Sequence, residues 1–357
     1  MDMTEVSRRL VDLLEIDWPI IQAPMVGVST PQMAAAVSNA GGLGSLGVGA
    51  MSPMAAAQAI DGFRARSRRS LNVNVFCHQP AVADPAREAA WLERLRPTFE
   101  AFHTQLPTAL SENYTSFTVD EAMFTTLLTA RPKVVSFHFG LPRRDWIRAL
   151  REAGIVLLAT ATSLLDAKAS VEAGVQVIVA QGYEAGGHRG MFEPDGPDDQ
   201  LGTLALTRIL ARSLSVPVIA AGGLMDGQGV AASLQLGAAA AQLGTAFVAT
   251  DESAAETGYR HALFSDAAHH TVMTRAISGR PARCLANRFT AWGREVHPDA
   301  VPTYPIAYDA GKALHAAART TGESGYGAQW AGQGAPLARR GGAGALLATL
   351  ADELARS

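Results

Sequence analysis

Short apolar runs alternate with longer amphipathic segments along the first 250 residues of the chain. Runs rich in Val, Ile and Leu are typical of strands that are buried on both faces of a parallel sheet, and the segments between them have helical periodicity. The predicted strands cover residues 19–24, 43–48, 71–76, 133–139, 155–160, 175–180, 216–221 and 239–243. Eight strands that alternate with helices predict an α/β fold, a (β/α)8 TIM barrel.

Capping residues and helix breakers mark the ends of the predicted helices. Thr30 and Pro31 stand at the start of a helix expected over residues 31–40, and Gly41 follows it. A hydroxyl side chain caps the first turn of a helix, proline is tolerated there, and glycine ends the last turn. Each strand is therefore expected to lead into a helix with a defined start.

Two segments depart from this repeat. Residues 77–130 are longer and more polar than an ordinary connection, so we expect an insertion with one or two helices, one of them over residues 85–95. Residues 251–357 become mainly helical, with helices predicted over residues 253–264, 308–320 and 345–354. We predict a barrel over residues 1–250 and a mainly helical extension that caps the barrel mouth. Plain packing on the outside of the barrel is the alternative role for this extension.

Composition narrows the class of protein. Apolar residues make up 48% of the chain, which suffices for a large core, and a net charge of −3 argues against a nucleic-acid partner. An apolar run of membrane-spanning length is absent, and residues 1–5 are acidic and unlike a signal segment. Two distant cysteines suggest neither a disulfide framework nor a zinc site. We therefore expect a cytoplasmic protein without a membrane span.

The clearest chemistry lies in residues 181–190, a glycine-rich polar loop that directly follows the predicted strand over residues 175–180. Loops at the carboxyl ends of barrel strands face the ligand, and glycines let the backbone approach it. His188 is the one side chain of the loop that exchanges a proton near neutral pH. We interpret it as catalytic, against the alternative of a solvated surface histidine.

Glycines also follow the last two predicted strands. Gly222 and Gly223 come after the seventh strand, and Gly244 and Thr245 come after the eighth. In barrels of this type these two loops often bind a phosphate through backbone N–H groups, and a threonine hydroxyl adds a donor. Either pair alone would indicate only a turn, but their joint placement predicts a phosphate site.

Three amides lie on predicted strands or strand ends, namely Gln22, Asn74 and Gln181. Buried amides need hydrogen-bond partners, and the polar edge of a flavin ring offers several. Amides that bridge neighbouring strands are the alternative, which we accept for Gln22. For Asn74 and Gln181 we favour contact with a ligand.

His138 and His188 stand at the ends of the fourth and sixth strands, where they can reach one substrate. Acidic residues at metal-ligand spacing are absent around them, so no metal site is expected, and no Gly-x-Ser-x-Gly motif indicates a serine hydrolase. A general base or an anion contact fits His188. Core packing is the alternative for His138, which lies between Phe137 and Phe139.

The chain resembles the nitronate monooxygenases, formerly grouped as 2-nitropropane dioxygenases, and in particular their class I bacterial type. The resemblance covers nearly the whole chain, and the histidine-bearing loop is its most specific part. It rests on residues 21–25, 40–44, 72–78, 136–140, 180–190, 221–223, 242–245, 308–312 and 329–334.

This resemblance implies a non-covalent FMN, oxidation of alkyl nitronates of the propionate 3-nitronate type by O2, and detoxification of nitro compounds. It assigns catalysis to His188. An anionic nitronate needs donor or cationic groups, for which we expect His138, Tyr308 and Lys312, although Gly311 predicts a break in the helix just before Lys312. The implied FMN contacts are Met25, Asn74, Gln181, Gly186, Gly222, Gly223, Gln242, Gly244 and Thr245.

Two other functions stay open on the sequence. One is an NAD(P)H-dependent flavin reductase of quinones or enoyl thioesters, and the other is a non-catalytic barrel that binds a phosphorylated ligand. The loop over residues 184–190 and the segment around Trp330 favour the nitronate reaction over the reductase, and His188 in an exposed ligand loop argues against the binding protein. We expect a monomer or a homodimer.

Overall fold

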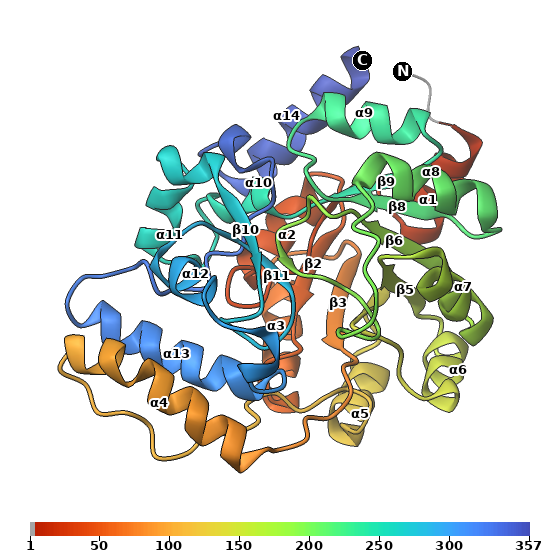
Figure 1. Ribbon diagram of the computed structural model, residues 1–357. Coiled ribbons are helices and arrows are strands. Elements are labelled where there is room, and N and C mark those ends of the chain that lie inside the picture. The colour runs from red at the N-terminus through yellow and green to blue at the C-terminus, as the bar shows by residue number, and fades with distance from the viewer. Residues whose placement is uncertain (1–3) are drawn as a thin grey trace.

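A computed structural model describes residues 4–357 and confirms the predicted barrel (Figure 1). Residues 1–3, part of the stretch that argued against a signal segment, lie outside the described residues. Parallel strands form one sheet in the order β1-β9-β8-β6-β5-β4-β3-β2, and a parallel bridge between Ile21 and Leu43 joins its two edges. These strands are β1 (Ile20–Gln22), β2 (Gly44–Gly47), β3 (Leu71–Phe76), β4 (Val134–His138), β5 (Val156–Ala161), β6 (Val177–Gln181), β8 (Val218–Ala221) and β9 (Ala240–Leu243).

Helices surround the sheet, and the caps expected from the sequence are present. Thr30 accepts a hydrogen bond from the backbone N–H of Met33 at the start of α2. The last helix, α14, packs against both α9 and α2, so the end of the chain lies in the ring of helices around the barrel (Figure 1). This ring contains α2 (Pro31–Asn39), α3 (Pro53–Arg64), α5 (Glu121–Ala130), α6 (Arg144–Glu152), α7 (Leu164–Ala173), α8 (Thr203–Ser213), α9 (Gly227–Gln235) and α14 (Ala343–Arg356).

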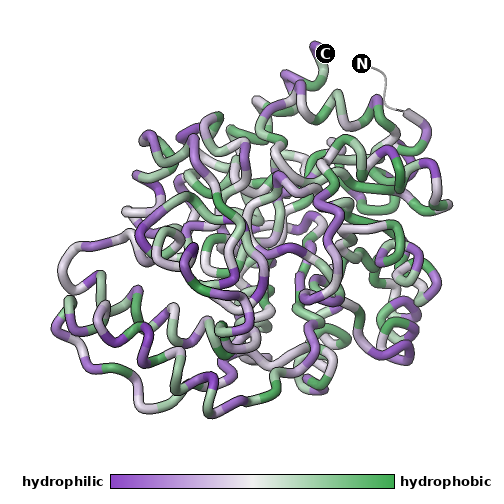
Figure 2. Tube along the Cα trace, in the orientation of Figure 1, coloured by the Kyte–Doolittle hydropathy of each residue, from purple (hydrophilic) through white to green (hydrophobic). Residues whose placement is uncertain are grey.

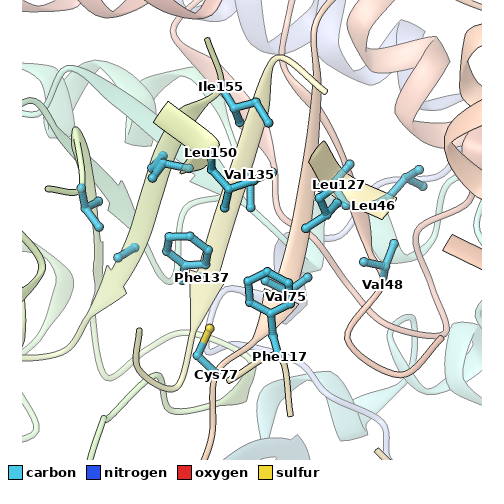
Figure 3. Close-up of a cluster of buried hydrophobic side chains, with 14 of the residues drawn as sticks. Leu46, Val48, Val75, Cys77, Phe117, Leu127, Val135, Phe137, Leu150 and Ile155 are labelled. Atoms are coloured by element: carbon cyan, nitrogen blue, oxygen red, sulfur yellow. The ribbon is translucent and has the colours of Figure 1, made fainter. Parts of the chain in front are cut away.

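Apolar side chains fill the space between the sheet and the helices. Val75 of β3 and Phe137 of β4 pack with Phe117 and Leu150 in one cluster (Figure 3). The outer helices alternate between hydrophobic and hydrophilic segments along the trace (Figure 2), because only one side of each helix faces the sheet. The amphipathic periodicity of the sequence therefore predicts the outer layer of helices.

Helix α1 (Glu5–Leu14) closes the amino end of the barrel. Its fully buried Leu10 and Leu14 join a cluster with residues at the starts of strands, such as Val134 and Val177. We call this end the floor and the carboxyl end the mouth.

The insertion differs in length from the prediction. The helix expected over residues 85–95 continues to Ala101 as α4 (Pro85–Ala101), with Pro97 inside it. This helix lies beside α13 (Ile306–Arg319) of the extension (Figure 1), and Phe99, in the part of α4 beyond residue 95, packs in a cluster with Leu314. The extension therefore provides the apolar surface that stabilises the additional length of α4.

Two predictions about the extension are wrong in detail. The helix expected over residues 253–264 shrinks to α11 (Thr257–Ala262). The predicted break at Gly311 is absent, since α13 runs through this residue. A Cβ at Gly311 would lie 2.5 Å from the carbonyl oxygen of Ile277, so this glycine serves close packing and not helix termination.

A small antiparallel sheet lies at the mouth and was not predicted. It joins β10 (Thr271–Thr274) and β11 (Ala282–Leu285) to β7 (Gly187–His188), which belongs to the histidine-bearing loop. The remaining elements are α10 (Thr245–Val248), η1 (Asp266–His269), α12 (Arg288–Gly293), η2 (Pro298–Ala300) and η3 (Ala335–Leu337). This sheet fixes the histidine-bearing loop to the extension.

Candidate active site

A cavity of about 340 Å³ lies at the mouth of the barrel. Its volume falls within the usual range of small-molecule sites. Strand ends from around the barrel line it, and Tyr304, Tyr308 and Trp330 of the extension contribute to its wall. Residues from the barrel and from the extension therefore enclose one site.

The structure brings nearly all the predicted site residues to this cavity. Those that line it are Met25, Asn74, His138, Gln181, Gly186, His188, Gly222, Gly223, Gln242, Gly244, Thr245 and Tyr308. Lys312 is not among the lining residues. Its Nζ lies 4.3 Å from the ring centre of Tyr114 and 5.2 Å from that of Tyr308, so its charge rests on two aromatic rings at the edge of the site.

Glycines shape one side of the cavity. Gly222 has φ +126° and Gly223 has φ +70°, conformations that side chains disfavour. A Cβ at Gly186 would lie 2.5 Å from the backbone nitrogen of Gly332. The backbone of Gly332 donates to the hydroxyl of Thr245 over 3.0 Å. These close approaches leave a smooth, backbone-lined wall of the kind that phosphate sites use.

Glu184 supports this wall, and sequence reasoning gave it no role. Its carboxylate accepts hydrogen bonds from the backbone N–H and the hydroxyl of Thr203, at 2.8 Å for the nearer oxygen in each case. Its backbone carbonyl accepts from the N–H of Gln333. Glu184 thus caps α8 and holds the 333 segment in place, and only the tertiary structure shows this.

A hydrogen bond and several aromatic rings fix the side chain of His188, which also lines the cavity. Its Nε2 lies 2.8 Å from the hydroxyl oxygen of Ser278. Its ring centre lies 5.0 Å from Trp330, 5.4 Å from Tyr304 and 5.6 Å from Phe139. These contacts leave the imidazole little freedom to rotate.

Gln181 and His138 hold the backbone of the same loop. The Nε2 of Gln181 donates to the carbonyl of His188 over 3.0 Å, and its Oε1 accepts from the N–H of Gly190 over 2.7 Å. The Nε2 of His138 lies 3.2 Å from the carbonyl of His188. The amide of Gln181 is therefore engaged with the loop, although the residue also lines the cavity.

The other two amides behave differently from each other. Gln22 accepts from the N–H of Ser45 over 2.8 Å and donates to the hydroxyl of Ser29, the structural role expected for it. The Nδ2 of Asn74 donates to the hydroxyl of Ser136 over 2.9 Å, and Asn74 and Ser136 both line the cavity. Asn74 is thus oriented by its neighbour strand.

Burial and positive charge keep the histidines of the mouth neutral. Desolvation, followed by the charges of His138 and Arg280, lowers the pKa of His188 to about 3. Desolvation and then Arg280 lower the pKa of His138 and of the nearby His78 to about 4. At neutral pH the imidazole of His188 is therefore uncharged, and a pKa this low makes it a weak proton acceptor.

Arg189 anchors the far end of the loop, and its role was not predicted. The side chain is 1% exposed and forms a bidentate salt bridge with Asp198, at 2.9 and 2.7 Å. Its Nη1 donates to the backbone carbonyl of Gln181 over 2.9 Å. A buried guanidinium that pairs with a carboxylate and a strand end fixes the register of the segment that carries His188.

Metal and membrane features are absent from the described residues. Within residues 4–357 there is no group of His, Cys, Asp and Glu side chains that could hold a metal ion. Cys77 and Cys284 are free and buried. In the same residues no helix has the length and apolar character needed to cross a bilayer.

Comparisons with known proteins identify the family of the chain. The family model described as Nitronate monooxygenase matches residues 7–353. The nitronate monooxygenase of Paraburkholderia phytofirmans is 59% identical over 98% of this chain and 96% of its own length. That of Pseudomonas aeruginosa is 51% identical over 98% and 99%. A crystal structure of nitroalkane oxidase from Streptomyces ansochromogenes superimposes with a TM-score of 0.89 and 40% identity, over 97% of this chain and 98% of that one.

The match spans both the barrel and the extension, and the relatives align over nearly their whole length. Members of this family depend on a flavin in general. The chain belongs to the nitronate monooxygenase family and is an oxidoreductase.

Proposed function

We propose that this enzyme binds FMN non-covalently at the mouth and oxidises alkyl nitronates with O2, with propionate 3-nitronate as the type of substrate. The observation that carries the proposal is that one cavity holds both the glycine-rich wall and His188. Detoxification of nitro compounds would be the biological result. Cytoplasmic location and assembly as a monomer or homodimer stay predictions.

The residues of the cavity suit FMN. Gly222, Gly223, Gly244 and Thr245 would hold the phosphate through backbone N–H groups and one hydroxyl. The ring would lie among Met25, Asn74, Gln181, Gly186 and Gln242, which line the same cavity. A side chain at Gly186 would collide with the backbone of Gly332, so the wall is kept free of side chains there. When bound, FMN would accept the electrons of the substrate and pass them to O2.

The histidines and the aromatic rings of the cavity suit a small organic anion. His138, His188 and Tyr308 line the cavity, and Lys312 adds a positive charge across the rings of Tyr114 and Tyr308. Apolar rings around a charge exclude water and strengthen its attraction for an anion. A nitronate would be held here beside His188.

His188 would also serve substrates that arrive as neutral nitroalkanes. Such a substrate must lose its α-proton before oxidation. The uncharged imidazole would take that proton because the negative charge that develops on the nitro group beside it favours the protonated ring and offsets the effect of burial. Because Ser278 occupies Nε2, the proton would be taken up at Nδ1. The nitronate then stays in place for oxidation.

Visible spectroscopy of the purified protein tests this function. A bound flavin should be present, and anaerobic addition of propionate 3-nitronate should bleach its spectrum, with recovery on admission of air. An unchanged flavin with nitronate but bleaching with NADH or NADPH would replace the proposal by a flavin reductase of quinones or enoyl thioesters. A colourless protein that takes up no FMN would contradict the cofactor, and a flavin that no electron donor reduces would indicate a binding protein.

A further inference from the structure

The turn Ser278-Gly279-Arg280, which we call the 278–280 turn, lies between β10 and β11 and contacts His188. Gly279 has φ +93°, and a Cβ there would lie 2.6 Å from the backbone nitrogen of Tyr304. The turn is therefore packed against the segment that brings Tyr304 to the cavity. The sequence motifs give it no role, and the proposed function uses only the contact of Ser278 with Nε2 of His188.

Ser278 is placed to select which nitrogen of His188 carries the proton. Its side chain is fully buried, with the hydroxyl 2.8 Å from Nε2 of His188 and 3.4 Å from the carbonyl of Arg280. A serine hydroxyl has one proton to donate. If it donates to the carbonyl, it accepts from an Nε2–H, and Nδ1 stays unprotonated.

Arg280 is a buried cation without a counter-ion. It is 3% exposed, and its guanidinium donates to the backbone carbonyl of Met191, while its Nε has no partner. Among the described residues it forms no salt bridge, whereas the equally buried Arg189 pairs with Asp198. Burial of an unpaired charge opposes folding, so packing alone does not account for an arginine at this position.

The charge of Arg280 is directed at the histidines of the mouth. Its Cζ lies 4.3 Å from the ring centre of Phe139, which is itself 5.6 Å from the ring of His188 and 4.4 Å from that of His138. Phe139 adopts φ +74°, a conformation that is strained for a phenylalanine. The ring of the strained Phe139 thus lies between the guanidinium of Arg280 and the imidazoles of His138 and His188.

We propose that the 278–280 turn is the positioning element of His188: Ser278 fixes the ring through Nε2, and Arg280 supplies a fixed positive charge that opposes a second charge on the ring. The lowered pKa of His188 agrees with this geometry, since Arg280 contributes to it after desolvation and His138. Burial lowers the pKa of Arg280 itself only to about 10, so it stays charged at neutral pH. The part that the neutral His188 ring plays in turnover rests on the proposed function. The charge state of this ring does not depend on that function.

Other charged or titratable groups face the same region and belong to the test. Those that act on His188 or Arg280 are His78, His138, Glu193, Asp195, Arg275 and Tyr304. Arg275 provides the matched control, because it carries the same charge in the same connection between β10 and β11 but pairs with Asp195 at 2.6 Å.

Nitrogen NMR of ¹⁵N-histidine-labelled protein, as purified, tests the proposal without turnover. The His188 signals are assigned by their absence in His188→Asn. In the unsubstituted protein we expect a neutral ring with its proton on Nε2 at pH 7 and no protonation down to pH 5. A His188 ring that titrates at or above the ordinary value of 6.5 would overturn the proposal, whether or not any variant folds.

Variants then separate the two residues. Arg280→Gln keeps a donor for Met191 but removes the charge, so the His188 titration should move toward 6.5, whereas Arg280→Lys and the control Arg275→Gln should leave it unchanged. Ser278→Ala should mix the two neutral tautomers without charging the ring. Equal shifts of the His188 pKa in Arg280→Gln and Arg275→Gln would contradict the role of Arg280. An unchanged tautomer of His188 in Ser278→Ala would contradict the role of Ser278.

Turnover with nitronate is recorded on the same samples. If the NMR results are as expected but no nitronate is oxidised, the proposed function fails and the positioning element stands. If nitronate is oxidised but His188 does not respond to Arg280→Gln or Ser278→Ala, the positioning element fails and the function stands.

Discussion

The floor and the mouth of this barrel bury very different side chains. At the floor, Leu10 and Leu14 of α1 pack in a cluster of apolar strand residues such as Val134. The Oδ1 of Asn72, which pairs in register with Val134, is a buried polar atom without a partner at this level. At the mouth, His78 has no partner for either ring nitrogen, and Tyr304 and Arg280 each bury an unpartnered polar atom. Apolar burial stabilises the fold, whereas buried polar groups without partners destabilise it. Apolar burial at the floor thus offsets the destabilising effect of the polar groups that the mouth needs for chemistry.

The mouth itself divides into two halves with different demands. Its glycine half depends on backbone shape, since Gly222 and Gly223 adopt positive φ and carry no side chain into the cavity. Its histidine half depends on electrostatics, because burial and Arg280 keep His188 uncharged. Substitutions should therefore affect cofactor retention in the first half and reaction rate in the second.

The largest effect is expected for Gly223→Asp, which should expel FMN. The new carboxylate would add negative charge within the predicted phosphate loop, and like charges brought together cost several kcal/mol, so flavin affinity should fall by about 100-fold or more. The flavin absorbance per chain after purification measures this.

Gly223→Ala is the matched control for Gly223→Asp. It shares the strain at φ +70° and the contact of its Cβ with Glu184, 3.3 Å away, but adds no charge. It should retain much more flavin than the aspartate variant. A Gly223→Asp protein that purifies with full flavin would contradict the phosphate placement.

His188→Asn should lower the rate but leave the flavin content unchanged. Loss of a general base typically costs about 10²- to 10⁴-fold, so kcat/KM for a neutral nitroalkane should fall within that range. Steady-state oxygen consumption gives the rate. His103→Asn, at an exposed position far along the insertion, should leave the rate unchanged. Loss of flavin in His188→Asn would instead reveal a structural role for the ring.

The sequence predicts the barrel well because its signals are local. Strands such as β6 (Val177–Gln181) are buried along their whole length and appear as largely apolar runs, and caps such as Thr30 lie next to the helices they start. Glycines and a histidine after strands also identify most of the cavity lining. These features require no knowledge of distant contacts.

Contacts between distant residues explain what the sequence missed. Ser278 meets His188 across 90 positions of the chain, and β7 consists of only two residues, too few to show a strand pattern. Gly311 was mistaken for a helix break because its close approach to Ile277 exists only in the packed structure. The positioning of His188 is therefore a property of tertiary structure, whereas its presence is a property of sequence.

Leu14→Ala tests the floor. Leu14 is fully buried, and removal of a buried leucine side chain typically costs about 2–5 kcal/mol of unfolding free energy through lost burial and a cavity. Urea unfolding measures this loss, and kcat of the folded fraction should not change because the cavity lies at the opposite end. Val6→Ala on the same helix, where Val6 is 44% exposed, should cost about 0.5 kcal/mol or less. Equal losses in the two variants would contradict the role assigned to the floor.

The smallest effect concerns pH and comes from the mouth. In the folded protein burial lowers the pKa of His78 to about 4 from an ordinary value of 6.5, so below 6.5 the unfolded chain binds a proton that the folded chain does not. Stability should therefore fall as the pH drops from 6.5 to 4, by up to about 1.4 kcal/mol per pH unit for each such histidine. His78→Phe keeps a ring against Tyr304 but removes one titrating group, so the slope of unfolding free energy between pH 5 and 6.5 should decrease by about that amount. Urea unfolding at several pH values measures the slope, with His103→Phe as the exposed control that should leave it unchanged. A slope that stays the same in His78→Phe would show that His78 is already protonated in the folded protein. The buried groups of the mouth would then lower the free energy of unfolding less than their lack of partners indicates.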